Sequence, residues 1–285
     1  MNRTTINIDK IREIALLGIR RTAAFLGLGV NAARNKQFTH YHLSSLSSFQ
    51  VIPDNLDDKS VAHMKEEFEN WIISNGLREL IEGFGLFLDE IHRSCLLMAT
   101  HKKLMTTDEA NTYGPTFKRK GVEGKLSALR TRFSVLSDKE KYFESINQAR
   151  NCITHRRGIV GSEDLKGRER FCLTWLGFDI YAETPTGERH SLTPPLPKEG
   201  LPLKDGGNIV LHFVDRIVEY KLGDNIRISP HELGDICFLV NIATEEIVKS
   251  TFEYAKSIGV NITVVRNGVE QPDITNRQKN QLLFF

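Results

Sequence analysis

An apolar stripe between residues 77 and 103 most constrains what this chain can fold into. Large apolar side chains recur there at the three- and four-residue spacing of a helix face: Leu80, Ile81, Phe84, Phe87, Leu88, Ile91, Cys95 and Met98. A stripe this wide must be covered from more than one side, so it predicts the central helix of a helical bundle. A separate helix is expected at 59–74, because Asn75-Gly76 is typical of a left-handed helix stop.

Two further helices are expected before residue 158. The first spans about 122–133. The second follows Ser137-Asp138-Lys139-Glu140, which has the spacing of a capping box, and ends at Gly158, which suits a left-handed C-terminal cap. The intervening segment Leu104–Gly121 is predicted to be a loop with about one helical turn. Four helices joined mainly by short connections predict an antiparallel bundle.

The composition changes after Gly161, where aromatic and β-branched runs replace the helical pattern. A long final helix is expected from Ser229-Pro230-His231-Glu232, a capping box with Pro at the first helical position, to about Ile258. One strand is expected after it, at 261–265. The aromatic and β-branched runs predict strands of a small antiparallel sheet at 171–176, 178–181, 208–213 and 217–221.

These patterns predict an α+β fold that is mainly α. Its expected order is an antiparallel helical bundle, a small antiparallel sheet and a long C-terminal helix. Three segments follow: 1–54, with an amphipathic helix at 7–28 and a linker; 55–165, the bundle; and 166–285, the sheet with the long helix, packed on the bundle.

The bulk composition limits the classes of function. With 38 Lys and Arg against 36 Asp and Glu, the chain has no overall basic character, so any affinity for RNA must be local. The four cysteines form no Cys-x-x-Cys pair, and no signal peptide or membrane span is visible, which predicts a cytoplasmic protein with reduced thiols. No His-Glu-x-x-His motif or phosphate-binding glycine loop occurs, so neither a metal site nor a cofactor is expected.

The residues with the most chemical potential lie at the end of the helix that closes the bundle, within Ala149–Gly158. Asn151 and His155 are four apart and share a helix face, whereas Arg150 is rotated by about 100° from Asn151. Arginine supplies a fixed cation with forked donors, and histidine supplies an imidazole that exchanges protons near neutral pH. Together with the amide, these groups suit chemistry at a phosphodiester.

Arg150, Asn151 and His155 also match the motif of the HEPN superfamily, in which Arg, a polar residue, three further residues and His occur on the last helix of a bundle. The chain resembles this superfamily over about residues 55 to 160. The resemblance implies a metal-independent endoribonuclease in which these three residues are catalytic. It also implies a toxin or antiphage role, with an antitoxin or regulatory protein as a partner.

One histidine per chain is too few for a cleavage that needs both a general acid and a general base. A two-fold homodimer brings two copies of the motif to one cleft, and HEPN nucleases are similar in this respect. We therefore expect a homodimer. Contacts to RNA are expected from the basic residues beside the motif and from the most basic local cluster: Arg156, Arg157, Lys118, Arg119 and Lys120.

The sequence leaves two other interpretations open. Arg150 and His155 can have a purely structural role, in which they cap the helix end and form ion pairs with Glu144 or Asp164. Alternatively, the bundle is a non-catalytic HEPN module that binds a nucleotide or a partner protein. The basic cluster at 118–120 can likewise be an ordinary solvated loop.

Overall fold

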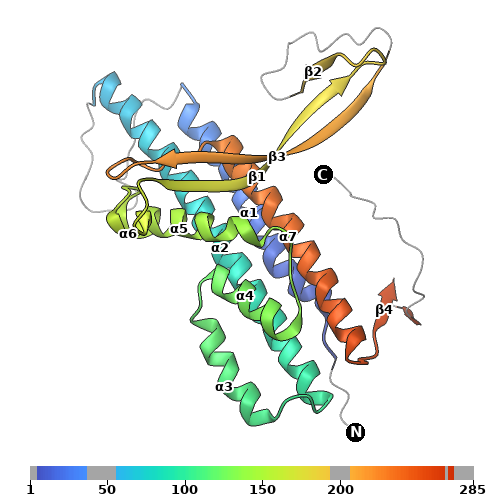
Figure 1. Ribbon diagram of the computed structural model, residues 1–285. Helices are drawn as coiled ribbons and strands as arrows, with labels where there is room; N and C mark the ends of the chain where they lie inside the picture. Colours follow the sequence, from blue (N-terminus) through green and yellow to red (C-terminus); the bar gives the residue numbers. More distant parts are fainter. Residues whose placement is uncertain (1–4, 37–55, 193–205, 267–268, 273–285) are drawn as a thin grey trace, which may run out of the picture.

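The computed structural model describes residues 5–36, 56–192, 206–266 and 269–272 of the chain. Three long helices, α1, α2 and α7, pack against one another, and a ribbon of two long antiparallel strands, β1 and β3, crosses them (Figure 1). The fold is mainly helical with a small antiparallel sheet and a long C-terminal helix, as predicted. The described elements in chain order are α1 (Ile8–Arg34), α2 (Asp58–His101), α3 (Thr107–Lys118), α4 (Val122–Phe133), α5 (Glu140–Arg156), α6 (Ser162–Leu165), β1 (Phe171–Glu183), β2 (Arg189–Ser191), β3 (Asn208–Tyr220), α7 (Pro230–Ser257), β4 (Thr263–Arg266) and β5 (Val269–Pro272).

Helix α2 runs without a break through Asn75 and Gly76, so the predicted stop at these residues is wrong. A methyl group at Gly76 would lie 2.9 Å from Cδ2 of Leu233 on α7 and 3.2 Å from Cγ2 of Thr22 on α1. The Thr22 hydroxyl also donates a hydrogen bond to the Gly76 carbonyl at 3.2 Å. The glycine therefore lets three helices approach closely, and it does not end one of them.

Helix α3 occupies a segment for which the sequence predicted a loop. A capping box fixes its start, because the Glu109 amide donates to the Thr106 hydroxyl at 3.2 Å and the Thr106 amide donates to the Glu109 carboxylate at 2.8 Å. The buried Phe117 near its end stacks on His92 of α2 with ring centroids 3.8 Å apart. Local capping and packing on α2 together make this segment helical. Helix α4 has the predicted bounds.

Helix α5, which carries the motif, begins differently from the prediction. The Ser137 hydroxyl donates to Glu246 of α7 at 2.6 Å instead of capping α5. The N-cap residue is Lys139, which makes no capping hydrogen bond through its side chain. The predicted capping box between Ser137 and Glu140 is therefore wrong, because the Glu140 amide donates to the Ser137 carbonyl at 3.2 Å, and the serine hydroxyl bonds to Glu246 and to the Lys139 amide instead.

The predicted left-handed end of α5 is confirmed. Arg157 and Gly158 follow the helix with φ values of 54° and 82°. The Gly158 carbonyl accepts a hydrogen bond from the Ile226 amide at 2.8 Å, and a methyl group at Gly158 would lie 2.6 Å from Oδ1 of Asn225. The end of α5 is thus fixed against the segment between β3 and α7.

The predicted antiparallel sheet is also confirmed, with strand order β2-β1-β3. The runs predicted as four short strands form two long ones, β1 and β3, in one register from the pair Phe171–Tyr220 to the pair Glu183–Asn208. On one side, the Ser145 hydroxyl of α5 accepts from the Thr174 amide at 3.0 Å. The hairpin therefore packs directly against the helix that carries the motif.

Helix α7 starts with the predicted Ser229 capping box and Pro230 in its first turn. Strand β4 takes most of the predicted strand at 261–265, and it pairs with β5. Within the described residues, no helix combines the length and the apolar character that a membrane span requires.

One hydrophobic core includes residues from all three predicted segments, such as Ile11, Phe84, Phe143, Leu173 and Leu239. The end of α5 lies at the edge of this core.

Candidate functional site

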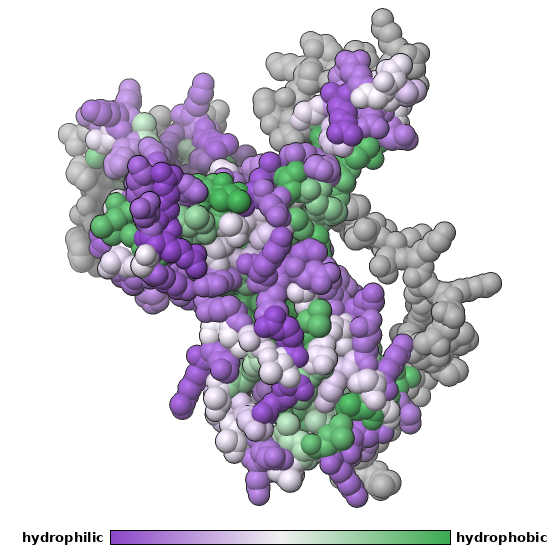
Figure 2. Space-filling view, in the orientation of Figure 1, coloured by the Kyte–Doolittle hydropathy of each residue, from purple (hydrophilic) through white to green (hydrophobic). Residues whose placement is uncertain are grey.

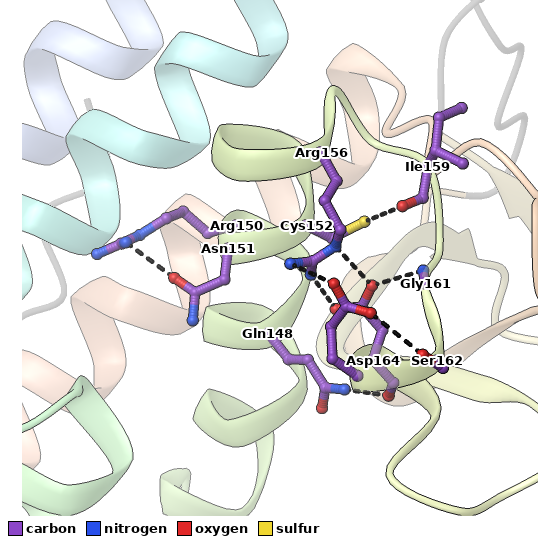
Figure 3. Close-up of polar contacts among 10 residues, drawn as sticks. Gln148, Arg150, Asn151, Cys152, Arg156, Ile159, Gly161, Ser162 and Asp164 are labelled. Carbon is purple, nitrogen blue, oxygen red and sulfur yellow. Dashed lines mark hydrogen bonds and ion pairs between the residues drawn. The ribbon is translucent and has the colours of Figure 1, made fainter.

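The last two turns of α5 carry Arg150, Asn151 and His155. Phe143, Ile146 and Ala149 anchor this helix in the core, so the polar residues point to its other sides. Arg150 is half-buried, and its Nη1 donates a hydrogen bond to Oδ1 of Asn151 at 2.9 Å (Figure 3). The structure thus joins two of the three predicted catalytic residues directly.

The Arg150 guanidinium pairs with no carboxylate among the residues that the structure describes. Its Nε atom is buried and has no hydrogen-bond partner there. The two acids considered for a structural role are engaged elsewhere: Glu144 pairs with Lys166 at 2.8 Å, and Asp164 pairs with Arg156. Among the described residues, the ion pairs that the structural alternative requires of Arg150 and His155 are therefore not formed, and Arg150 retains capacity to bind an anion.

A groove of about 400 Å³ runs along one face of α5. Asn147, Asn151 and His155 line it at four-residue spacing, so they form a polar row along the helix. His155 is exposed. Arg150 does not line the groove but lies on its flank, where Asn151 connects it to the row. The motif therefore presents an imidazole and an amide to the groove, with a guanidinium beside them.

The groove is acidic on balance. Figure 2 shows hydrophilic residues together with hydrophobic ones on the visible surface around α6, which contributes Glu163 and Asp164 to the lining of the groove. The lining contains four carboxylates, Glu123, Glu144, Glu163 and Asp164. It contains two permanently charged cations, Arg156 and Lys166. Such a lining repels an anion that enters the groove away from Arg150.

Arg156, one of the predicted RNA contacts, is held by acids of α6. Its Nε donates to Asp164 Oδ2 at 3.1 Å, its Nη2 pairs with Asp164 Oδ1, and its Nη1 lies 3.2 Å from Glu163 (Figure 3). The same Asp164 carboxylate accepts the Gly161 amide at 2.9 Å. These pairs hold its pKa above the usual value for an arginine, although burial works in the opposite direction. Arg156 therefore fastens α6 to α5 and is not a free cation.

The other predicted RNA contacts are exposed. Arg157 directly follows α5, Lys118 ends α3, and Arg119 and Lys120 lie in the turn between α3 and α4. This turn lies close to α5, since a methyl group at Gly121 would be 3.2 Å from Nδ2 of Asn147. The structure therefore places the basic turn beside the end of the groove opposite His155.

Cys152 lies inside the motif without taking part in the groove. Burial is the main cause that raises the pKa of its thiol to about 11, and the nearby Asp164 adds to the shift. The thiol donates a hydrogen bond to the Ile159 carbonyl at 3.2 Å. It is therefore protonated at neutral pH and supports the turn after α5 instead of acting as a nucleophile.

Several residues of the groove were not predicted from the sequence, among them Asn147, Gln148 and Glu123. Asn147 Nδ2 donates to Glu123 Oε2 at 2.9 Å, and Gln148 Nε2 donates to the Asp164 carbonyl. The four-residue spacing of Asn147 from Asn151, which is repeated from Asn151 to His155, could have indicated that Asn147 shares their helix face. Glu123 comes from α4, and no sequence pattern connects it to the motif.

Comparisons with models of protein families, with curated protein sequences and with solved structures give no match for this chain.

Proposed function

We propose that this chain is a metal-independent endoribonuclease whose active site is the end of α5, completed by a second copy of the chain. The observation that carries the proposal is the state of Arg150. It is half-buried, has no acidic partner among the described residues, and is hydrogen-bonded to Asn151 beside the exposed His155. This arrangement offers a cation, an amide and a proton carrier to one phosphodiester, and it resembles the HEPN motif.

In the proposed reaction, the RNA supplies its own nucleophile. The 2′-hydroxyl attacks the adjacent phosphorus, and the bond from phosphorus to the 5′-oxygen of the next nucleotide breaks. The products are a 2′,3′-cyclic phosphate and a free 5′-hydroxyl. His155 takes the proton of the 2′-hydroxyl, and the partner subunit's His155 protonates the leaving oxygen. Arg150 stabilises the charge on the non-bridging oxygens, while Asn151 holds the guanidinium in place.

Incubation of purified protein with end-labelled RNA in excess EDTA tests this function. We expect cuts that leave cyclic-phosphate ends, and a loss of at least a hundredfold in Arg150→Ala and His155→Ala. Arg20→Ala on α1 and His101→Ala at the end of α2 are matched controls, since neither residue lines the groove. No cleavage of varied RNAs, with tight binding of a nucleotide or a protein instead, would favour the non-catalytic module.

The acid-base roles also predict a particular dependence on pH. One imidazole must be neutral and the other protonated, so kcat/KM should pass through a maximum and fall on both sides. The profile between pH 5 and 9 measures this directly. A flat profile would contradict proton transfer by His155.

An RNase of this kind harms its own host unless it is restrained. We therefore propose a toxin or antiphage role in which an antitoxin or regulatory protein controls the activity. Co-expression of the chain with genes that neighbour its own tests this role, because a true antitoxin restores growth without lowering the amount of folded protein.

A further inference from the structure

Three amide side chains on α5 have orientations that their partners dictate. Glu123 and the Asp164 carbonyl can only accept hydrogen bonds, so Asn147 and Gln148 must direct their nitrogens toward them. Arg150 can only donate, so Asn151 must direct its oxygen toward the guanidinium. The remaining amide atoms are thereby assigned without ambiguity.

This assignment divides the groove into two ends. Near the end of α5, the amide nitrogen of Asn151 is left to donate beside the Arg150 guanidinium (Figure 3), and His155 follows one turn later on the same face of the helix. One to two turns earlier, or about 5 to 11 Å away, each amide nitrogen keeps a second N–H, and the oxygens that remain are acceptors. These are the carbonyl oxygens of Asn147 and Gln148 and the second carboxylate oxygen of Glu123.

The two ends suit two parts of one nucleotide. A phosphate carries only acceptors, so it fits the donor end and is repelled by the carboxylates of Glu123 and Glu144 at the other end. A nucleobase is uncharged, so the acidic lining does not exclude it, and an edge with N–H groups fits the acceptors. Asn147 is only 6% exposed, and its hydrogen bond to Glu123 sets the direction of its amide for such a contact.

We infer that the groove around Glu123 and Asn147 binds the base of the nucleotide whose 3′-phosphate is cleaved, and that it prefers guanine. Guanine presents N1–H and N2–H side by side on its Watson–Crick edge, which matches two neighbouring acceptors, the remaining carboxylate oxygen of Glu123 and the carbonyl oxygen of Asn147. Uracil presents one N–H flanked by two carbonyl oxygens, which the acceptors of the groove repel. This inference rests on the proposed function, since it assigns the phosphate to Arg150, Asn151 and His155.

Binding of mononucleotides tests the inference without any cleavage. We expect isothermal titration to show tighter binding of guanosine 3′-monophosphate than of uridine 3′-monophosphate, by about tenfold or more. Glu123→Gln keeps the shape and an acceptor for Asn147 but removes the carboxylate, so it should abolish most of this preference. Glu219→Gln is the matched control, because Glu219 lies on β3 and pairs with Arg170 at 2.6 Å, away from the groove lining.

A cleavage assay on RNAs that differ in a single guanine separates this inference from the proposed function. Cuts mainly after guanine, with the preference lost in Glu123→Gln, support both. RNA cut with no base preference, and equal binding of the two mononucleotides, overturns the guanine site alone. Guanosine-selective binding that depends on Glu123, without any cleavage, supports the guanine site and overturns the nuclease.

Discussion

Two arginines six positions apart on α5 differ in what they can bind. Arg156 forms ion pairs with two acids of α6, whereas Arg150 has an amide as its hydrogen-bond partner and no carboxylate among the described residues. From the sequence, Arg150 was predicted to be catalytic because it matches the motif, and Arg156 was predicted to contact RNA because it is a cation beside the motif. The sequence could not show this difference in pairing, because it arises from the position of α6, which tertiary folding determines.

Replacement of Arg156 tests its role as a structural cation. Arg156→Met leaves Asp164, whose side chain is 2% exposed, without its main counter-charge. We expect a loss of about 3 kcal/mol in the free energy of unfolding, because an unpaired buried carboxylate is strongly unfavourable. Arg157→Met, at the neighbouring exposed position, should change stability by less than about 0.5 kcal/mol. Urea denaturation measures both, and equal effects would contradict the distinction.

His92 makes the stability of the fold depend on pH. Burial and then the charge of Arg132 lower its pKa to about 4, whereas an unfolded histidine titrates near 6.5. Between these values the unfolded chain binds more protons, so His92 stabilises the fold above pH 6.5 and this contribution is lost as the pH falls toward 4. We expect the contribution of His92 to the free energy of unfolding to be about 2 kcal/mol smaller at pH 5 than at pH 7.

The variant His92→Phe isolates this contribution. It retains an aromatic ring to stack on Phe117 but cannot titrate. The readout is the difference in unfolding free energy between pH 7 and pH 5, so a uniform change from altered packing does not affect it. The same difference in the variant and in the original chain would show that His92 does not titrate as described.

At the scale of the element, the sequence predicted those features that depend on a few consecutive residues. The capping box at Ser229 and the left-handed end of α5 are of this kind, and both were confirmed. The prediction failed where a distant element changed the role of a residue. Ser137 bonds to Glu246, more than a hundred positions later, and Gly76 faces Leu233. No local pattern carries that information.

Because Gly76 lies where three helices approach closely and Gly27 does not, we expect alanine at these two positions to have opposite effects on stability. A methyl group at Gly76 meets Leu233 and Thr22, so Gly76→Ala should lower stability by about 1 kcal/mol despite the better helix propensity of alanine. A methyl group at Gly27 of α1 has nothing within 4 Å, so Gly27→Ala should raise stability by about 0.5–1 kcal/mol. Thermal unfolding followed by circular dichroism compares them. A stabilised Gly76→Ala protein would show that the three helices do not pack tightly there.

At the scale of the whole molecule, the groove combines residues from α4, α5 and the α6 region, which the sequence separates by up to 43 positions. The sequence located the motif because its three residues lie on one helix. The sequence could not predict that Glu123 and the acids of α6 line the groove, because only the fold brings them next to α5. The hydrophobic core, which joins α1, α2, α5, β1 and α7, holds these walls together.

The proposed second copy makes activity depend on pairs of chains, and mixing experiments measure that dependence. In an equimolar mixture of the original chain and His155→Ala, random pairing leaves about a quarter of the dimers with two histidines. Above the dimer dissociation constant, cleavage should therefore fall to about half of that shown by the same amount of original chain alone. An unrelated protein at equal mass concentration should have no effect.

Dilution provides the complementary measurement for the same pairing. Below the dimer dissociation constant, activity per chain should fall as dimers separate, because each separated chain retains only one His155. Sedimentation at the same concentrations then relates the loss of activity to the loss of dimers. If the mixture retains the full activity of the original chain and dilution leaves activity per chain unchanged, each chain is a complete catalyst. A single imidazole would then serve as both base and acid, and the composite site would be wrong.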